Sequence, residues 1–266
     1  MDFNLIIIGD EIIQGSRVDT HFSAIKNLLN ERGLRLRQVQ YLPDDRELIT
    51  LTLQRSLQDA YPTFVTGGIG GTPDDHTRQA AAQALGLPLA LHPEAVPAIE
   101  AIAERRGESL DDPNHLIRLN MATFPAGVDL VPNLYNNIAG FSAQEHYFLP
   151  GFPVMAHPMV TWVLDTIYPH FHHQIQYQSL STWIYNVPES NITTLMHDIE
   201  NNYPGIQTFS LPSTLQDANS PYQYRIEFGL KAQNQASEQL PQAWAMALAT
   251  IQNLGGVLQA IDSPSE

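Results

Sequence analysis

A glycine-rich segment followed by two aspartates is the strongest chemical signal in this chain. Residues 66–77 read Thr-Gly-Gly-Ile-Gly-Gly-Thr-Pro-Asp-Asp-His-Thr. Glycines let a loop approach a ligand closely and present N–H groups to an anion, and Thr72 and Pro73 are typical of a helix start. Asp74 and Asp75 would repel a bound phosphate. Either a divalent cation lies between them and the phosphate, or they only cap the next helix.

A second acidic segment begins at Gly9 and continues as Asp10-Glu11-Ile-Ile-Gln-Gly15. It follows an apolar run that predicts a buried strand, and ligands of parallel sheets bind beyond the carboxyl ends of strands. Asp10 and Glu11 are therefore candidates to ligate a metal or to polarise an attacking water, unless they form only a solvated acidic loop. The chain has neither a Walker lysine nor a GxGxxG order in these segments, which disfavours nucleoside-triphosphate and Rossmann sites.

Alternating strand and helix patterns must position these loops. Asp44 and Glu47 predict a capping box, with Asp44 as the N-cap of a helix. Because β and α patterns alternate, we expect a parallel sheet covered by helices on both faces. Strands are expected at residues 4–8, 35–41, 63–66, 128–131 and 146–149, and helices at 18–32, after Asp44, from Thr72 to about 86, and at 94–106, 114–121 and 153–168.

The pattern changes after Pro169, where histidines stand at positions 170, 172 and 173. These histidines belong to a zinc site or, as we favour, to an exposed linker. We place a domain boundary near residue 172, with a first domain at 1–172 and a second at 173–266. The second domain is expected to be a small α+β unit of βαββα order, with strands at 178–185, 206–211 and 222–230 and helices at 190–203 and 237–253.

Composition limits the possible partners. The chain has 13 basic and 28 acidic residues, a formal charge of −15, and no cysteine. Nucleic-acid affinity depends on Lys and Arg, so we expect no nucleic-acid partner. No apolar run, the one at residues 5–8 included, is long enough for a membrane span, and no secretory signal is visible. We expect no membrane partner and a cytoplasmic location.

Several sequence blocks resemble the molybdopterin-binding domain of the competence/damage-inducible protein A (CinA) family. They are the segments at 9–15, 19–20, 43–45, 66–77 and 149–153, in the family's order. The resemblance implies a MoaB/Mog-like α/β domain, with a parallel sheet that has a mixed edge and helices on both faces, a KH-like second domain and a homodimer. It also implies metal-dependent pyrophosphatase activity on ADP-ribose or a related dinucleotide, with molybdopterin or a nucleotide as the ligand. The nicotinamide-mononucleotide deamidase domain of longer relatives has no expected counterpart here.

The residues and the resemblance together define the predicted site. Asp74, Asp75, Asp10 and Glu11 are the predicted catalytic residues, and Asp74 and Asp75 would bind Mg²⁺, Mn²⁺ or Co²⁺. A small phosphorylated ligand would be held by further residues, namely Gly67, Gly68, Gly70, Gly71, Thr72, Thr77, Gly9, Gly15, Arg17, Arg78, Asn133, Gly140, Pro150 and Gly151.

Three residues depart from the family pattern, and residues 136–141 have also drifted from it. His21 replaces an Asn, Gly71 a Pro and Met155 a Glu. Two functions follow: a metal-dependent pyrophosphatase, or a non-catalytic module that binds a pterin or nucleotide in an altered pocket. A third possibility is a structural protein that assembles through its second domain.

Overall fold

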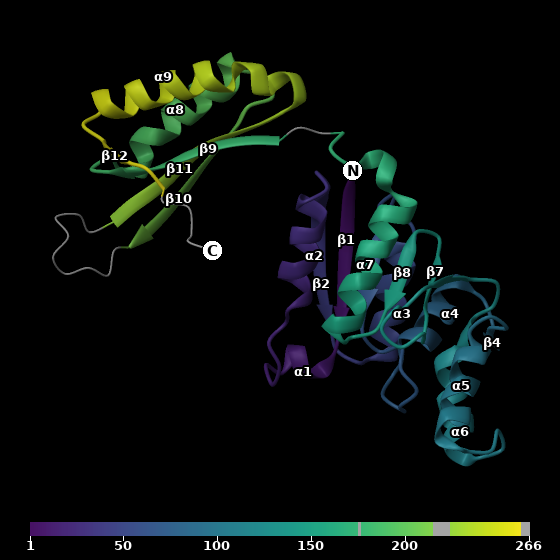
Figure 1. The fold of residues 1–266 in the computed structure, drawn as a ribbon. Helices are drawn as coiled ribbons and strands as arrows, with labels where there is room; N and C mark the ends of the chain where they lie inside the picture. Colours follow the sequence, from purple (N-terminus) through teal and green to yellow (C-terminus); the bar gives the residue numbers. More distant parts are fainter. Residues whose placement is uncertain (175–176, 215–223, 262–266) are drawn as a thin grey trace. The chain divides into compact units, whose positions relative to one another are not determined.

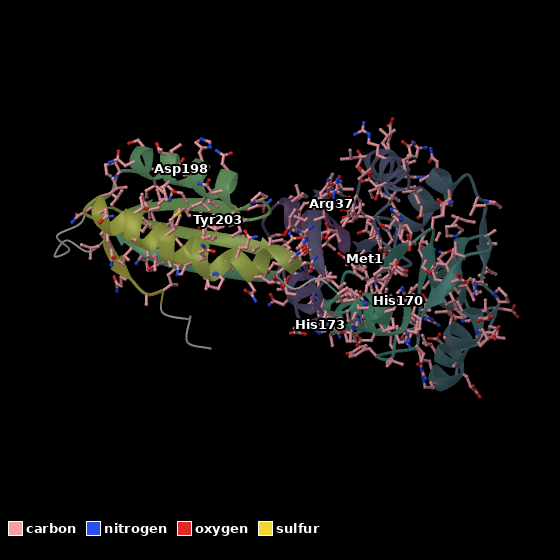
Figure 2. All side chains as sticks on the ribbon, turned by 90° about the horizontal axis from the view of Figure 1, so that it is seen from above. Met1, Arg37, His170, His173, Asp198 and Tyr203 are labelled. Carbon is pink, nitrogen blue, oxygen red and sulfur yellow. The ribbon has the colours of Figure 1, made fainter. Side chains whose placement is uncertain are left out.

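The computed structural model describes residues 1–174, 177–214 and 224–261 (Figure 1). The chain divides into two compact units, Met1–His172 and His173–Glu266. His170 and His173, labelled in Figure 2, stand on either side of this division. In the described part of the chain, no helix has both the length and the apolar character needed to cross a membrane.

A six-stranded mixed sheet forms the centre of the first unit. Its strands lie in the order β2-β1-β3-β8-β7-β6. The first four are parallel, and β7 and β6 add an antiparallel edge. Their bounds are β1 Asp2–Ile8, β2 Arg35–Leu42, β3 Thr63–Thr66, β8 His146–Leu149, β7 Gly140–Ala143 and β6 Asp129–Val131. The expected α/β sheet with a mixed edge is confirmed.

Helices cover both faces of this sheet. Phe3, Leu5 and Ile7 of β1 pack against α2 (His21–Asn30) and α7 (Pro153–Ile167). Ile6 and Ile8 point the other way, toward α3 (Arg46–Ser56), α4 (Thr77–Leu85) and α5 (Val96–Arg106). Because successive side chains of a strand alternate, the unbroken apolar run of β1 supplies both cores.

The first unit also contains short elements that the sequence did not predict. They are α1 (Asp10–Ile13), the β4–β5 pair (Leu89–Leu91 and Thr123–Pro125), and β7. These strands have three or four residues, too few to show an alternation. The expected helix at 114–121 is α6 (Pro113–Leu119) followed by η1 (Asn120–Ala122), and η2 (Pro169–Phe171) follows α7.

The second unit is an antiparallel sheet of order β10-β11-β9-β12 with α8 and α9 packed against it. It has the expected βαββα order with one further strand, β12, which is only three residues long. The elements are β9 (Tyr177–Tyr185), α8 (Glu189–Asn202), β10 (Gln207–Thr214), β11 (Tyr224–Gln233), η3 (Asn234–Gln239), α9 (Leu240–Asn253) and β12 (Val257–Gln259). Positions 222–223 of the expected strand lie outside the described residues.

Candidate functional site

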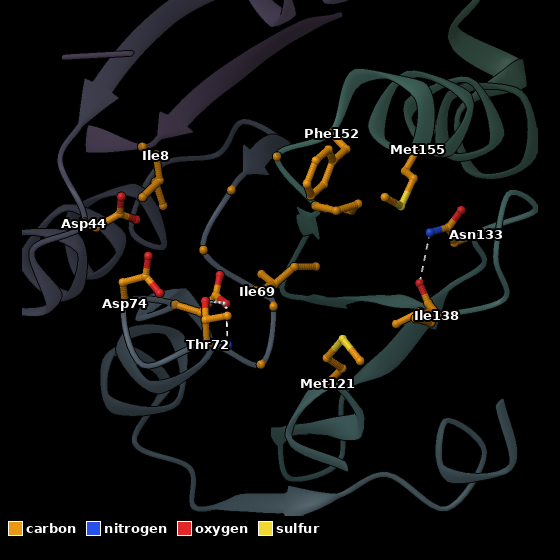
Figure 3. A pocket seen from close by; sticks show the side chains of 18 of the residues that line it. Ile8, Asp44, Ile69, Thr72, Asp74, Met121, Asn133, Ile138, Phe152 and Met155 are labelled. Carbon is orange, nitrogen blue, oxygen red and sulfur yellow. Dashed lines mark hydrogen bonds between the residues drawn. The ribbon is translucent and has the colours of Figure 1, made fainter. Parts of the chain in front are cut away.

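A pocket of about 420 Å³ lies in the first unit, where the loops after β1, β2, β3 and β8 meet (Figure 3). Thirteen of the predicted site residues line it. They are Gly9, Glu11, Arg17, Gly67, Gly68, Gly70, Gly71, Thr72, Asp74, Asp75, Asn133, Pro150 and Gly151. The sheet order brings β1, β3 and β8 side by side, so loops distant in the sequence converge at one edge.

The glycine loop is held closely against its neighbours. Gly67 has φ 99°, and its N–H donates to the Leu149 carbonyl at 3.0 Å. A Cβ at Gly67 would lie 2.1 Å from the Ile8 carbonyl oxygen, so only glycine fits there. Among the described residues, none accepts a hydrogen bond from the N–H groups of residues 68–71. The loop thus offers four successive backbone donors beside the pocket.

The segment between this loop and α4 is a turn and not the predicted first turn of the helix. The Asp75 carboxylate accepts from the Thr72 N–H at 2.8 Å and from the Thr72 hydroxyl at 2.6 Å. Thr77 donates from its N–H to Gly68 and from its hydroxyl to Gly67, each at 2.9 Å. Thr72 is therefore not the N-cap, because these bonds tie Thr77 to the glycine loop, and α4 begins at Thr77.

Arg78 is a buried support of the loop and not a lining residue. It is 3% exposed, and its guanidinium donates to the carbonyls of Gly70, Asn120 and Thr123. Burial lowers its pKa. All of its described acceptors are backbone carbonyls, so the Arg78 guanidinium stabilises the conformation of the glycine loop.

Four other predicted residues also lie outside the set that lines the pocket. Thr77 is buried and holds the loop. The carboxylate of Asp10 accepts the Asp44 N–H at 3.1 Å. A Cβ at Gly15 would meet nothing within 4 Å, whereas one at Gly140 would lie 2.3 Å from the Phe148 carbonyl oxygen. Gly140 therefore serves strand pairing, as its place in β7 requires.

Asp44 joins the loops after β1 and β2. Its carboxylate accepts the Asp10 N–H at 2.9 Å, which makes the contact with Asp10 reciprocal. Asp45, and not Asp44, caps α3, because its carboxylate accepts the Leu48 N–H at 2.8 Å. Burial raises the pKa of Asp44, and the nearby carboxylates of Asp10, Glu11 and Asp74 raise it further. The predicted capping box was wrong by one residue, and Asp44 instead lines the pocket.

Glu11 and Asp74 complete an acidic wall with Asp44. Both are exposed, and hydrogen bonding lowers the pKa of Asp74, which keeps that group ionised. Arg17 is the one basic side chain among the lining residues that the structure describes. Within the described ranges, no three His, Asp or Glu side chains gather as a ready-made metal site.

The opposite wall is mostly apolar (Figure 3). Phe152, Met155, Ile138 and Met121 line it. The amide of Asn133 is already used within its own loop, since it donates to Asn136 and to the Ile138 carbonyl and accepts from the Tyr135 N–H. This wall therefore offers a ligand surface for van der Waals contact.

Several lining residues were not among those predicted. They are Ile8, Asp44, Ile69, Met121, Asn136, Ile138, Ala139, Phe152 and Met155. The sequence signal for Asp44 was its position after a predicted parallel strand. Met121 had no such signal, because it follows a helix far along the chain.

Among the described residues, the histidines at positions 170, 172 and 173, near the boundary between the two units, do not belong to any cluster that could hold a metal ion. His172 bonds to the Leu164 carbonyl at 3.1 Å, and His170 packs its ring against Phe171.

Comparison with known proteins assigns the first unit to a protein family. Residues 4–170 match the family described as "Probable molybdopterin binding domain". CinA-like proteins of Geobacter sp. (strain M21) and Citrifermentans bemidjiense are 31% identical over 202 and 198 residues. These alignments cover 74% and 72% of this chain but 47% and 46% of those proteins, so the chain spans about half the length of these curated relatives.

A solved structure shares the fold. The CinA protein of unknown function from Thermoplasma acidophilum superposes with a TM-score of 0.53 at 24% identity, covering 62% of this chain and 97% of that one.

Proposed function

The chain belongs to the probable molybdopterin binding domain family, with CinA-like proteins as relatives, and on that premise we propose a function for its pocket. The pocket binds a small phosphorylated ligand together with a divalent cation and hydrolyses a pyrophosphate linkage. ADP-ribose or a related nucleotide is the proposed substrate. The observation that carries this proposal is one pocket that combines the acidic wall with the N–H groups of residues 68–71, for which no described residue is an acceptor.

The two features suit a phosphate that arrives with a cation. Backbone N–H groups are good donors to phosphate oxygens, while the four carboxylates that line the pocket would repel an unaccompanied anion. Mg²⁺ is commonly held by one or two carboxylates, with phosphate oxygens and water completing its coordination. A pocket without three clustered ligands fits that mode. Burial and the neighbouring carboxylates raise the pKa of Asp44, and a bound cation would offset this crowding of negative charge.

Each group of residues then has a distinct role. Asp74 would hold the cation with Asp44 in place of the predicted Asp75, whose carboxylate accepts two hydrogen bonds from Thr72. The cation would supply charge neutralisation at the phosphates when bound. The Asp75 carboxylate stabilises the loop by accepting hydrogen bonds from Thr72, and it also adds negative charge to the pocket. The N–H groups of residues 68–71 would bind the phosphate oxygens, and Phe152 and Ile138 would contact the nucleoside.

Glu11, which lines the pocket, would take the proton of the attacking water. The water oxygen forms a bond to one phosphorus atom as the bond from that phosphorus to the bridging oxygen breaks. The bridging oxygen leaves on the other phosphate, and two monophosphates are released. Asp10 is less suited to this role, because its carboxylate accepts a hydrogen bond from the Asp44 N–H and the residue does not line the pocket.

Turnover by purified protein tests the proposal. The protein is incubated with ADP-ribose or FAD and with Mg²⁺, Mn²⁺ or Co²⁺, and products are separated by chromatography. We expect cleavage only with a metal, and its loss in Asp74→Ala and Asp75→Ala. Asp129→Ala is the matched control, since Asp129 is exposed at the start of β6 and is not a lining residue. Wild-type turnover no higher than that of Asp74→Ala would refute hydrolysis.

A non-catalytic module that holds a pterin or nucleotide is the second candidate. It is favoured by the apolar wall, where Met155 accepts a weak bond from Asn136 and the Asn133 amide is engaged internally. No charged side chain from that wall reaches the pocket among the described lining residues. Calorimetry with recovery of the ligand separates the two functions: saturable binding with intact ligand supports the module.

A further inference from the structure

Both helices of the second unit pack on one face of its sheet (Figure 1). The core between them and the sheet contains Ile226, Phe228 and Leu230 of β11. In the described part of this unit, neither α8 nor α9 packs on the opposite face, which we call the open face. Side chains alternate along a strand, and the strand register assigns to the open face Trp183 of β9, Phe209 and Leu211 of β10, and Arg225, Glu227 and Lys231 of β11.

The basic residues of the second unit both lie on the open face. Residues 173–266 include two basic residues, Arg225 and Lys231, against eight acidic ones. Cζ of Arg225 lies 3.7 Å from the centre of the Trp183 ring, and Nζ of Lys231 lies 4.6 Å from that of Phe209. Glu227 stands between the two cations on the same strand. An acidic unit therefore gathers its positive charge on one face of its sheet.

Contacts within the open face hold its rings and cations in place. A Cβ at Gly229 would lie 2.2 Å from Cζ of Phe209, so the Phe209 ring covers this glycine. Nε of Arg225 donates to the Ser213 hydroxyl at 3.4 Å. Leu211, which pairs with Glu227 in the ladder, is 56% exposed. Aromatic rings, arginine and exposed apolar surface together are typical of a protein interface.

The two cations set the spacing that a partner has to match. Arg225 and Lys231 are six residues apart on β11, and a strand rises about 3.4 Å per residue, so their backbone positions lie about 20 Å apart. In an extended peptide, carboxylates at the first and seventh residues have the same spacing. The third and fifth side chains lie on that same side of the peptide, where they would contact Phe209 and Leu211.

We propose that the open face binds an acidic, extended polypeptide segment, in which two carboxylates about 20 Å apart flank apolar side chains. The carboxylates pair with Arg225 and Lys231, and the apolar side chains cover Leu211 and the Phe209 ring. Such a segment complements both the excess positive charge of the face and its apolar surface.

Charge and area favour this occupant over two others. The open face of a second copy carries the same excess of positive charge. Moreover, strands about 4.8 Å apart give a face of roughly 500 Å², below the about 800 Å² per partner of a standard stable interface. A single-stranded nucleic acid would meet two cations on this face of a chain whose net charge is −15.

A titration followed by nuclear magnetic resonance tests the proposal on the full-length protein labelled with ¹⁵N. The probe is the peptide acetyl-Glu-Ser-Leu-Ser-Phe-Ser-Glu-amide, and the indole N–H signal of Trp183, assigned with Trp183→Phe, reports binding. We expect a saturable shift of this signal. The isomer acetyl-Ser-Leu-Glu-Ser-Glu-Phe-Ser-amide should bind about fivefold more weakly, because its carboxylates cannot reach both cations at once. No shift at millimolar peptide, or equal affinity for the two isomers, overturns the proposal.

Charge variants of the open face should change the affinity in opposite directions. Arg225→Gln and Lys231→Gln should each weaken binding of the probe about fivefold, whereas Glu227→Gln should strengthen it by removing a repelling carboxylate. Lys26→Gln is the matched control, since Nζ of Lys26 lies 6.0 Å from the centre of an aromatic ring in the first unit. Circular dichroism checks the fold of each variant, and if Arg225→Gln unfolds, the variants at 227 and 231 still decide. Unchanged or weaker binding by folded Glu227→Gln overturns the charge match.

Two measurements identify the other occupants. Self-association that Leu211→Ser abolishes, measured by light scattering, would assign the open face to a second copy. A shift of the Trp183 signal with a thymidine oligonucleotide, and none with the peptide, would assign it to nucleic acid. We expect neither result, and either one overturns the acidic segment as the occupant.

Discussion

Alanine at Gly67 is expected to destabilise the first unit far more than alanine at Gly15. Both glycines have positive φ, 99° and 73°, so each substitution pays a backbone penalty of about 1–2 kcal/mol. The added Cβ at Gly15 would meet nothing within 4 Å, whereas that at Gly67 would lie 2.1 Å from the Ile8 carbonyl oxygen and 3.1 Å from its carbon. Gly15→Ala is thus a matched control for backbone strain.

The contact at Gly67 can be relieved only if the ends of β1 and β3 separate. Such overpacking costs about 1–3 kcal/mol. Separation also weakens the 3.0 Å bond from the Gly67 N–H to the Leu149 carbonyl, which is worth about 1 kcal/mol. We therefore expect a loss of about 4 kcal/mol for Gly67→Ala, against about 1 kcal/mol for Gly15→Ala.

Hydrogen exchange measured by mass spectrometry on peptides from β1 and β3 follows the first unit by itself. Protection of these peptides should fall by about three orders of magnitude in Gly67→Ala and by about one in Gly15→Ala, since 1.4 kcal/mol corresponds to tenfold. Equal protection in the two variants would refute the close approach of the glycine loop to β1.

Three further predictions concern buried and paired charges in the first unit. Arg78→Ala should destabilise it by about 3 kcal/mol in urea denaturation, because three carbonyls lose a charged donor, and unchanged stability would contradict that role. The hydrogen bond from Arg32 lowers the pKa of Asp165. The stability that this pair contributes is therefore present above the ordinary carboxyl pKa of 3.8 and is lost as the pH falls below it. The free energy of unfolding of Arg32→Gln should differ from that of wild type at pH 7 and match it near pH 2. Burial lowers the pKa of His146, so its contribution to the free energy of unfolding is complete above the ordinary histidine pKa of 6.5 and decreases below it. Between pH 7.5 and 5, His146→Gln should therefore lose less stability than wild type. An equal loss in the two proteins would show that His146 does not cause the pH dependence.

The place of the site could be predicted because it depends on topology. An apolar run ending at Ile8 and a short β-rich segment ending at Thr66 mark two buried strands, and parallel strands place their following loops at one edge. The glycine loop and Glu11 were predicted on this basis, and the structure brings both to the pocket.

Local hydrogen bonding could not be read from residue type alone. Asp44 and Asp45 are adjacent and either one can cap a helix, yet only the three-dimensional approach of Asp10 decides that Asp44 bonds across to the neighbouring loop. The start of α4 was misplaced for the same reason, because the bonds of Thr77 to the glycine loop compete with a helix that begins at Thr72.

The apolar wall was the least predictable part of the pocket. Met121, Ile138 and Phe152 come from three separate segments. Only the segments at 136–141 and 149–153 could be compared with the family pattern, and Met121 had no sequence signal. Arg78 shows the opposite error, since its nearness in sequence to the glycine loop suggested phosphate binding. Burial among backbone carbonyls gives it a supporting role instead.

A crystal structure of the protein soaked with ADP-ribose and Mn²⁺ tests whether the pocket binds a pyrophosphate together with a divalent cation. We expect an anomalous Mn²⁺ signal beside Asp74 and Asp44, with diphosphate oxygens within hydrogen-bond distance of the N–H groups of residues 68–71. Bound ADP-ribose with its phosphates away from that loop, or a pocket that stays empty at saturating ligand and metal, would contradict it.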